Sequence, residues 1–213
     1  MIQLNQIKPA PLLPDGIDPK TQTWGKKIAF EKGKFYLITA PSGKGKSTFV
    51  HILYGLRTDF EGAFKLKGQE HQAIKMNDWS DIRKNTLSVI FQDLRLFLNL
   101  SAMDNLLLQN NLTKHKTVEE IKQMAKQLGI SDLLEKTCST LSYGQRQRVA
   151  IIRALCQPFE FLLLDEPFSH LDQNNIAKAT QLIKEECQGQ KAGLILVSLG
   201  DKYLFDYDKE LIL

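Results

Sequence analysis

Residues 40–48 read Ala40-Pro41-Ser42-Gly43-Lys44-Gly45-Lys46-Ser47-Thr48, and this stretch decides the fold. It follows an apolar segment, Phe35–Thr39, that predicts a β-strand, and it opens a helix that we expect to run from about Lys46 to Leu56. Phosphate oxygens need several amide donors at close range, which small residues permit, and they gain from the positive end of a helix dipole. The strand, loop and helix together therefore predict a phosphate-binding loop.

Two side chains of this loop carry its chemistry. The Lys46 ammonium would reach the β- and γ-phosphates of a nucleotide, and the Ser47 hydroxyl would coordinate Mg²⁺. Ala40 stands where such loops usually begin with glycine. A lysine-rich surface turn is the alternative interpretation of the same residues.

A pair of carboxylates follows a second apolar strand. The segment Phe161–Leu164 is continuously apolar, as in a strand buried on both faces, and it ends in Asp165 and Glu166. Placing two carboxylates at the end of such a strand is costly unless something binds there. We expect Asp165 to hold Mg²⁺ directly or through water, and Glu166 to orient and deprotonate an attacking water. Taken alone, an Asp-Glu pair after a strand is also typical of a helix-capping turn.

Composition limits the class of protein. With 213 residues, 43% of them hydrophobic and 24% charged, the chain is predicted to form a single globular domain, 1–213. The formal net charge of +4 comes without a Lys/Arg block, so no nucleic-acid partner is expected. The 3 cysteines lack C-x-x-C spacing, which fits a reducing cytosol rather than a disulfide framework or a zinc site. We expect no transmembrane segment, because no apolar run approaches the ~18–20 residues that span a bilayer, and no signal peptide.

Strands alternate with helices along the chain, which predicts an α/β fold with a mostly parallel sheet covered on both faces. The segments Ile2–Ile7, Trp24–Phe30 and Phe60–Leu66 predict strands, and we expect a small antiparallel sheet near the N-terminus. Between the strands Leu87–Phe91 and Phe161–Leu164 the apolar spacing is helical, so we expect a helical subdomain from about 93 to 157, inserted in the nucleotide-binding core. Further predicted elements are a capping box at Thr117–Glu120, a helix at about Asn174–Cys187, and strands at Leu194–Val197 and near Glu210–Leu213.

A third motif identifies a family. The run Leu141-Ser142-Tyr143-Gly144-Gln145-Arg146-Gln147-Arg148-Val149-Ala150 closely resembles the L-S-G-G-Q signature of ABC ATPases and the basic, apolar helix that follows it. Gln92 resembles that family's Q-loop, and Ser169–Asp172 resembles its D-loop. The motifs occur in the family's order and cover nearly the whole chain from Trp24 onward. The resemblance implies a P-loop ATPase that uses ATP and Mg²⁺.

The resemblance also implies roles for individual residues. Ser142, Gly144 and Gln145 would contact the γ-phosphate of ATP held by an opposite protomer, and a helix N-terminus of this composition suits an anion. Asp172 would report across the interface, and Gln92 would touch the metal or the attacking water and move with a partner. The chain would then form an ATP-dependent dimer with itself or with a paralogous ATPase.

Several positions depart from the family pattern. Tyr143 replaces the first glycine of the signature. Leu199 stands where the family has a histidine that hydrogen-bonds the γ-phosphate, and either Ser198 or His170 could take over that interaction. The family stacks adenine on an aromatic residue of the N-terminal loop, but residues 9–20 contain none. Trp24 is the nearest aromatic; we expect it to pack within a strand of the small antiparallel sheet, and stacking on adenine is the alternative role.

The implied function is to power a separate membrane-embedded permease from the cytoplasmic face of the membrane. A coupling helix of that permease would dock on the apolar strip beside Gln92, which comprises Leu94, Leu96, Phe97, Leu98 and Leu100. Plain core of the helical subdomain is the alternative for this strip. The segment 91–108 and the signature are also similar to ATPases of the lipoprotein-release and macrolide-efflux group.

Other functional classes of ABC ATPase fit the chain less well. ABC ATPases of chromosomes and DNA repair insert a long coiled coil before the signature, and ribosome-associated translation factors carry two such domains in tandem. Neither feature occurs here. A transporter-like ATPase that drives signalling or cell-wall remodelling through a membrane partner remains the alternative function.

Overall fold

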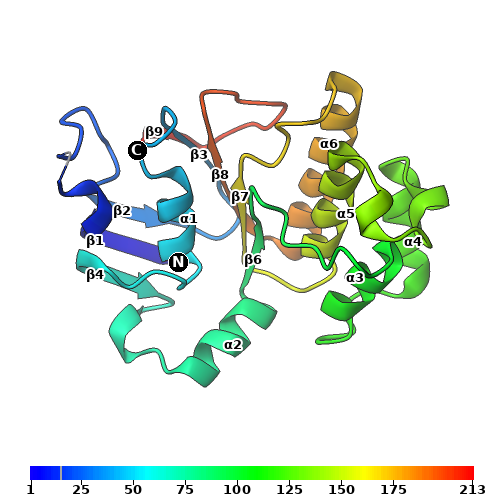
Figure 1. The fold of residues 1–213 in the computed structure, drawn as a ribbon. Coiled ribbons are helices and arrows are strands. Elements are labelled where there is room, and N and C mark those ends of the chain that lie inside the picture. The colour runs from blue at the N-terminus through cyan, green and yellow to red at the C-terminus, as the bar shows by residue number, and fades with distance from the viewer. Residues whose placement is uncertain (15) are drawn as a thin grey trace.

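Two β-sheets organise the chain (Figure 1). The computed structural model describes residues 1–14 and 16–213, so Asp15, in the loop predicted after the first strand, lies outside the described residues. The larger sheet has five strands in the order β6-β7-β8-β3-β9, and its neighbours pair in parallel. Its strands are β3 (Phe35–Thr39), β6 (Leu87–Ile90), β7 (Phe161–Asp165), β8 (Gly193–Ser198) and β9 (Lys209–Ile212).

The register of the parallel sheet brings distant loops to one edge. Thr39 of β3 lies beside Ser198 of β8, and Asp165 of β7 lies beside Val197. In a parallel sheet the carboxyl ends of the strands share an edge, which is where open α/β sheets bind ligands. The loops that follow β3, β6, β7 and β8 therefore emerge at one edge.

A smaller antiparallel sheet has the strand order β2-β1-β4-β5. Its strands are β1 (Ile2–Pro9), β2 (Lys27–Phe30), β4 (Phe60–Leu66) and β5 (Gln69–Glu70). The prediction of a strand over Trp24–Phe30 is wrong for its first part, because Trp24 and Gly25 form a turn. The Thr21 hydroxyl accepts hydrogen bonds from the amides of Thr23 and Trp24, which holds the chain in this turn before β2 begins.

Six α-helices occur in the described ranges: α1 (Lys46–Leu53), α2 (Met76–Asn85), α3 (Ala102–Asn110), α4 (Val118–Gln127), α5 (Tyr143–Leu155) and α6 (Gln173–Gln190). Short 3₁₀ turns occupy Ala10–Leu12, His71–Ala73, Ser131–Leu133 and Cys138–Thr140. The predicted capping box is present, since the Thr117 hydroxyl accepts from the Glu120 amide and the Glu120 carboxylate accepts from the Thr117 amide. Sequence reasoning missed α2, which buries one side chain, Trp79, and therefore lacks an apolar stripe.

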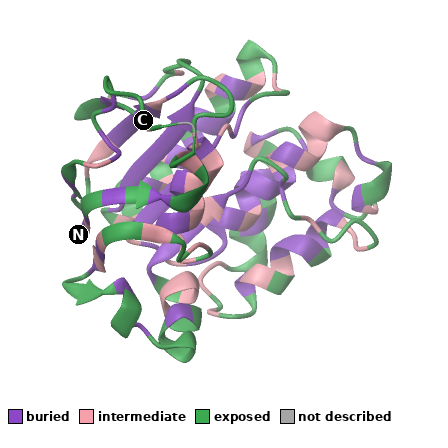
Figure 2. Ribbon diagram, turned by 60° about the vertical axis from the view of Figure 1, so that its left-hand side comes forward, coloured by how far each residue is buried: buried purple, intermediate pink, exposed green. Residues whose placement is uncertain are grey.

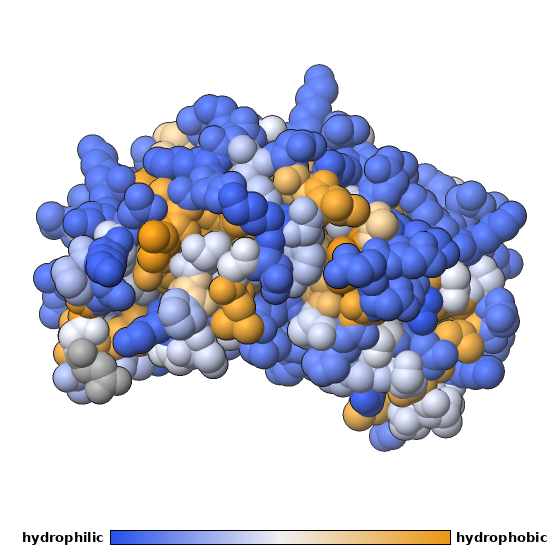
Figure 3. All heavy atoms as spheres, turned by 90° about the horizontal axis from the view of Figure 1, so that it is seen from above, coloured by the Kyte–Doolittle hydropathy of each residue, from blue (hydrophilic) through white to orange (hydrophobic). Residues whose placement is uncertain are grey.

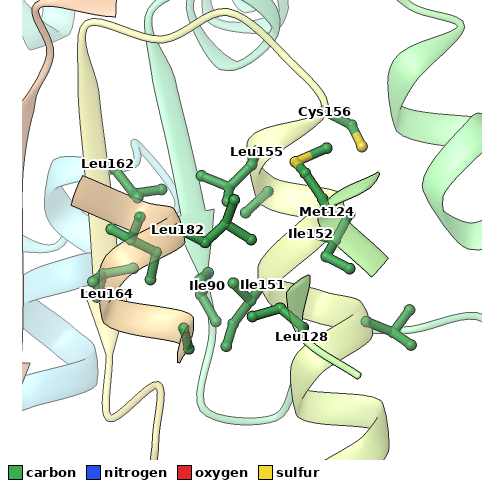
Figure 4. Packing of buried hydrophobic residues seen from close by; sticks show 14 of the residues in the cluster. Ile90, Met124, Leu128, Ile151, Ile152, Leu155, Cys156, Leu162, Leu164 and Leu182 are labelled. Atoms are coloured by element: carbon green, nitrogen blue, oxygen red, sulfur yellow. The ribbon is translucent and has the colours of Figure 1, made fainter. Parts of the chain in front are cut away.

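Two hydrophobic clusters hold the layers together (Figure 2). One joins a face of the parallel sheet to α1 and the antiparallel sheet. The other joins the opposite face to α5 and α6 and extends to α3 and α4, as the packing of Leu162, Leu164, Ile152, Leu182 and Met124 shows (Figure 4). The helices α3, α4 and α5 follow β6 and precede β7, so the chain leaves the sheet after β6 and returns to it at β7 (Figure 1).

The three cysteines are buried and free. Burial raises the pKa of both Cys156 and Cys187 to about 12, so these thiols stay protonated at neutral pH. Among the described residues no helix is both long and apolar enough to cross a membrane.

Candidate functional site

The loop between β3 and α1 has the backbone that close approach to phosphate requires. Gly43 and Gly45 adopt left-handed conformations, with φ of 77° and 91°. The φ of Gly45 strains any other residue, and a Cβ there would lie 2.8 Å from Cδ1 of Leu12, so the Leu12 side chain would have to shift. Ala40 is buried and its amide donates to the Ser198 carbonyl over 3.2 Å. Alanine is accommodated at this position because residue 40 needs no left-handed backbone.

Lys46 folds back over this loop. Its side chain is 7% exposed, and its Nζ donates to the carbonyl oxygens of Ala40 and Pro41 at 3.2 Å each. The same Nζ lies 3.2 Å from Oε1 of Glu166. An ammonium has three protons to donate, and these three acceptors satisfy it in the free protein.

Asp165 is buried at the end of β7, with 1% of its surface exposed. Burial raises the pKa of this carboxyl group; the charge of Glu166 raises it further, while the nearby Ser47 hydroxyl opposes the shift. Its Oδ1 is buried and has no hydrogen-bond partner within the described ranges 1–14 and 16–213. An unpartnered buried carboxylate oxygen is costly, so this atom is available to a ligand.

Glu166 leaves the strand in a left-handed conformation, with φ of 48°. Its amide donates to the Val197 carbonyl over 3.0 Å, which keeps the residue beside β8. A non-glycine residue at positive φ is strained, and such strain concentrates at functional sites. The turn directs the Glu166 carboxylate toward Lys46 while Asp165 stays buried behind it.

The phosphate-binding loop, Lys46 and Glu166 border a cleft of ≈ 400 Å³ at the carboxyl edge of the sheet. The lining residues come from the N-terminal loop, the phosphate-binding loop, the Gln92 segment (residues 92–95), Glu166 and the residue after β8. They are Pro11, Leu12, Ser42, Gly43, Gly45, Lys46, Ser47, Thr48, Gln92, Glu166 and Leu199. The structure therefore brings together most of the residues that the sequence assigned to the phosphates and to the attacking water. From above, this face is largely hydrophilic, with hydrophobic residues in separate patches (Figure 3).

A second hollow of ≈ 390 Å³ adjoins the first and shares Ser47 and Gln92 with it. Its other lining residues are His51, Phe91, Asp93, Arg95, Tyr143 and Asp165. Sequence reasoning did not assign His51 or Arg95 to the site. The Arg95 guanidinium lies 3.7 Å from the centroid of the Phe91 ring, a contact made across the irregular segment 91–95 rather than within a helix or strand.

The Gln92 segment has a strained backbone that Arg153 holds. Leu94 and Arg95 are consecutive left-handed residues, with φ of 59° and 49°. Arg153 of α5 donates to both of their carbonyl oxygens at 2.6 Å. Burial lowers the pKa of the Arg153 guanidinium. Sequence reasoning did not single out Arg153, because its partners lie far away along the chain.

The signature residues lie at the start of α5. Ser142 is the N-cap, its Oγ accepting from the Gln145 amide at 3.3 Å, while Gln145 Oε1 accepts from the Ser142 amide at 2.8 Å. Gly144 packs so closely on the next segment that a Cβ would lie 2.8 Å from the His170 carbonyl oxygen. Asp172 caps α6 through the Asn175 amide. Neither cleft is lined by Ser142, Gly144, Gln145 or Asp172 of the same chain.

Trp24 is packed in the core rather than presented to the cleft. It is 3% exposed, and its ring meets Phe49 edge-on with centroids 5.7 Å apart. It lies behind Gly45, with Cζ2 3.5 Å from the position that a Cβ there would take. Pro11 and Leu12, from the N-terminal loop, line the cleft, and Trp24 does not.

Comparisons with known proteins agree with this geometry. A family model described as "ABC transporter" matches residues 25–169. The chain belongs to the ABC transporter family. It is 36% identical over 174 residues to the thiamine import ATP-binding protein ThiQ of Escherichia coli O157:H7, covering 80% of this chain and 72% of that protein.

Other relatives extend the match. The lipoprotein-releasing system ATP-binding protein LolD of Pseudoalteromonas translucida is 32% identical over 195 residues, covering 88% of this chain and 84% of that protein. The dimeric structure of MJ0796, a bacterial ABC transporter cassette, has a TM-score of 0.80 and 25% identity, covering 93% of this chain and 88% of that one. MJ0796 bound to ADP and Pi in a post-hydrolysis state has a TM-score of 0.77.

These findings confirm the ABC ATPase resemblance, the α/β cassette fold and the assignment as an ATP hydrolase of the kind that powers a transporter. The expected likeness to the lipoprotein-release group is matched by LolD, although ThiQ is slightly more similar, with 36% identity against 33%. The likeness is therefore to ABC transporter ATPases in general rather than to that group.

The burial of Asp165 leads to a stability prediction. Asp165→Asn should stabilise the free protein by about 1–3 kcal/mol at neutral pH, because the amide carries no charge in a buried site where Oδ1 lacks a partner. Urea denaturation without nucleotide measures the change. Asp59→Asn is the control, since Asp59 is exposed and paired with Arg57. An Asp165→Asn protein less stable than the wild type would show that the free carboxylate is already well accommodated.

Proposed function

We propose that the chain binds Mg²⁺-ATP in the cleft beside Lys46, hydrolyses it in a dimer, and thereby powers a membrane-embedded permease. The observation that carries this proposal is the meeting of the phosphate-binding loop, Asp165, Glu166 and Gln92 around adjoining hollows at one edge of the sheet. An ABC ATPase needs a phosphate-binding loop, a metal site and a general base, and each has a candidate side chain here.

Residues 40–48 would hold the phosphates, with Lys46 as the fixed counter-ion. The left-handed glycines and the start of α1 present amides to an anion. In the free protein the acceptors of Lys46 are two carbonyls and Glu166. A γ-phosphate would compete with Glu166 for that ammonium, and the released carboxylate could then accept a proton from water.

The residues present fit Mg²⁺. Asp165 offers an unpartnered buried oxygen, Ser47 offers a hydroxyl next to it, and Gln92 lines the same hollow. Mg²⁺ prefers oxygen ligands and usually keeps several waters, so one or two protein oxygens together with the phosphates suffice. When bound, the ion would neutralise charge on the phosphates. Gln92 would contact this ion or the attacking water.

Dimerisation would complete the site. Ser142, Gly144 and Gln145 line neither cleft of their own chain, yet they form a helix N-terminus suited to an anion. An opposite protomer, identical or paralogous, would supply them to the γ-phosphate. Asp172 is exposed near this helix start and would lie at the interface.

The first test uses Glu166→Gln. This variant should bind ATP but stall hydrolysis, because an amide cannot accept the proton of the attacking water, and it should accumulate as an ATP-dependent dimer on a sizing column. Lys46→Ala added to the same variant should abolish the dimer, because the phosphates lose their counter-ion. A Glu166→Gln protein that stays monomeric with ATP while the wild type dimerises would refute the role of Glu166.

Leu199 lines the cleft beside Lys46 and Glu166 with 55% of its surface exposed, and it offers no hydrogen-bond donor from its side chain. The Ser198 hydroxyl is engaged in its own turn, donating to the Asp201 carbonyl at 2.7 Å and accepting from the Gly200 amide. His170 packs on Tyr143 and lines neither cleft. These contacts favour an impaired site over a takeover by either residue.

Leu199→His should therefore raise the steady-state ATPase rate by about tenfold or more, because one preorganised donor commonly contributes a factor of ~10²–10³. Turnover at saturating ATP is the measurement, with His170→Ala assayed in parallel. A collapse of turnover in His170→Ala would support takeover by this histidine. If wild-type turnover is ordinary for the family and neither change alters it, the account of Leu199 is wrong.

A permease would dock on the apolar strip beside Gln92, at the cytoplasmic face of the membrane. The strip divides in two: Leu94 is buried in the core, whereas Phe97 and Leu98 are 59% and 44% exposed. The buried Asn105 side chain bonds both the amide and the carbonyl of Phe97, at 2.8 and 3.0 Å. The exposed ring thus stands on a fixed backbone, which suits a helix-in-groove contact. In this proposal residues 1–213 form one domain, in which 93–157 are the helical subdomain that carries the strip.

Replacing the exposed ring tests this surface. Phe97→Glu should reduce co-purification of a polytopic membrane protein from detergent-solubilised membranes by about tenfold or more, because aromatic anchors dominate such contacts. Val118→Glu, at another exposed apolar position, should have no effect. Equal recovery of the membrane protein with Phe97→Glu and with the wild type would show that this strip is not the docking surface.

A further inference from the structure

Tyr143 connects three segments that the sequence treated as separate motifs. Its hydroxyl donates to the Gln92 carbonyl oxygen over 2.7 Å. The Tyr143 ring lies against the His170 ring, with centroids 4.2 Å apart. The Arg146 guanidinium lies 5.5 Å from the centroid of the Tyr143 ring. The glycine found at this position in the signature that the chain resembles could make none of these contacts.

The support behind Tyr143 is rigid. The next residue, Gly144, is packed so tightly on the His170 carbonyl that a side chain would not fit. Gln147 Oε1 accepts from the His170 amide at 3.3 Å, and the Gln147 side chain is buried. The start of α5 and the segment that follows β7 therefore pack closely against each other, and Tyr143 projects from this contact.

The Gln92 segment depends on outside contacts for its shape. Gln92 and Asp93 are exposed, and the left-handed Leu94 and Arg95 that follow are held by Arg153. Tyr143, from the same helix as Arg153, binds the other end of this short segment through the Gln92 carbonyl. Gln92 borders both hollows, so a shift of its backbone changes where its side chain reaches relative to Ser47 and Asp165.

We propose that Tyr143 is a positioning residue that fixes the Gln92 backbone to the start of α5 and so sets the place of the Gln92 side chain during turnover. The proposal rests on the role of Gln92 in the proposed function. A bond from a neutral hydroxyl to a carbonyl contributes modestly, so its loss should change rates by small factors and should not unfold the protein.

The experiment compares Tyr143→Phe with Tyr207→Phe. Both tyrosine hydroxyls donate to a backbone carbonyl over 2.7 Å, but Tyr207 binds Lys202 in the connection before β9, outside both hollows. Phenylalanine keeps the ring that packs on His170 and removes only the donor. Hydrogen exchange is measured in the free protein on peptides that cover 91–98, and kcat and KM for ATP are measured separately.

We expect Tyr143→Phe to speed exchange in 91–98 and to lower kcat about three- to tenfold with little change in KM, whereas Tyr207→Phe alters neither. Unchanged exchange in Tyr143→Phe would show that the hydroxyl does not hold the segment. Faster exchange with unchanged kcat would show that the hold does not position Gln92 for turnover. Either result overturns the proposal. A wild type without ATPase activity would instead refute the proposed function, and the exchange data would still decide whether Tyr143 holds the segment.

Discussion

The Lys46 ammonium is the charge around which the cleft is arranged. A nearly buried cation is tolerable only when its protons are satisfied, and removing a partner from a buried pair commonly costs ~3–5 kcal/mol. Lys46 meets this requirement with the carbonyls of Ala40 and Pro41 and with Glu166. The curled loop and the left-handed turn of Glu166 thus both supply acceptors to the Lys46 ammonium. With the proposed role of Glu166 as the base, this ion pair keeps the site closed to chemistry until another anion reaches Lys46.

The parts of this arrangement that follow from local pattern could be predicted from the sequence. Apolar runs identified β7 and β8, and a parallel sheet necessarily places the loops after its strands at one edge. The sequence alone therefore predicts that Lys46, Asp165 and Glu166 lie near one another. It also assigned the signature to a helix start, which the Ser142 cap bears out.

The remainder depends on contacts between residues far apart in the chain. The helix α2 buries only Trp79, so its pattern gives no stripe to detect. Trp24 has the apolar character of a strand residue, but the Thr21 hydroxyl captures local amides and turns the chain. The left-handed pair Leu94 and Arg95 exists because Arg153 reaches it from α5, across 59 residues of sequence in the case of Leu94. No window of sequence contains both halves of such an interaction.

The relatives share the ATPase machinery with this chain but are named for different transport processes. ThiQ and LolD are named for thiamine import and for lipoprotein release, yet they are similar to this chain to almost the same degree. Because the matched region 25–169 spans the phosphate loop, the carboxylates and the signature, that similarity reflects a shared ATPase. In the proposed function, the choice of permease therefore depends on surfaces outside the phosphate cleft. Exposed apolar side chains on a fixed backbone, such as Phe97 held through Asn105, can differ between chains without disturbing Lys46 or Asp165.

Tyr143 is a different kind of departure, since it alters the connection between the cleft and the helix that carries the signature. Partner choice and turnover rate can therefore change independently on one cassette fold.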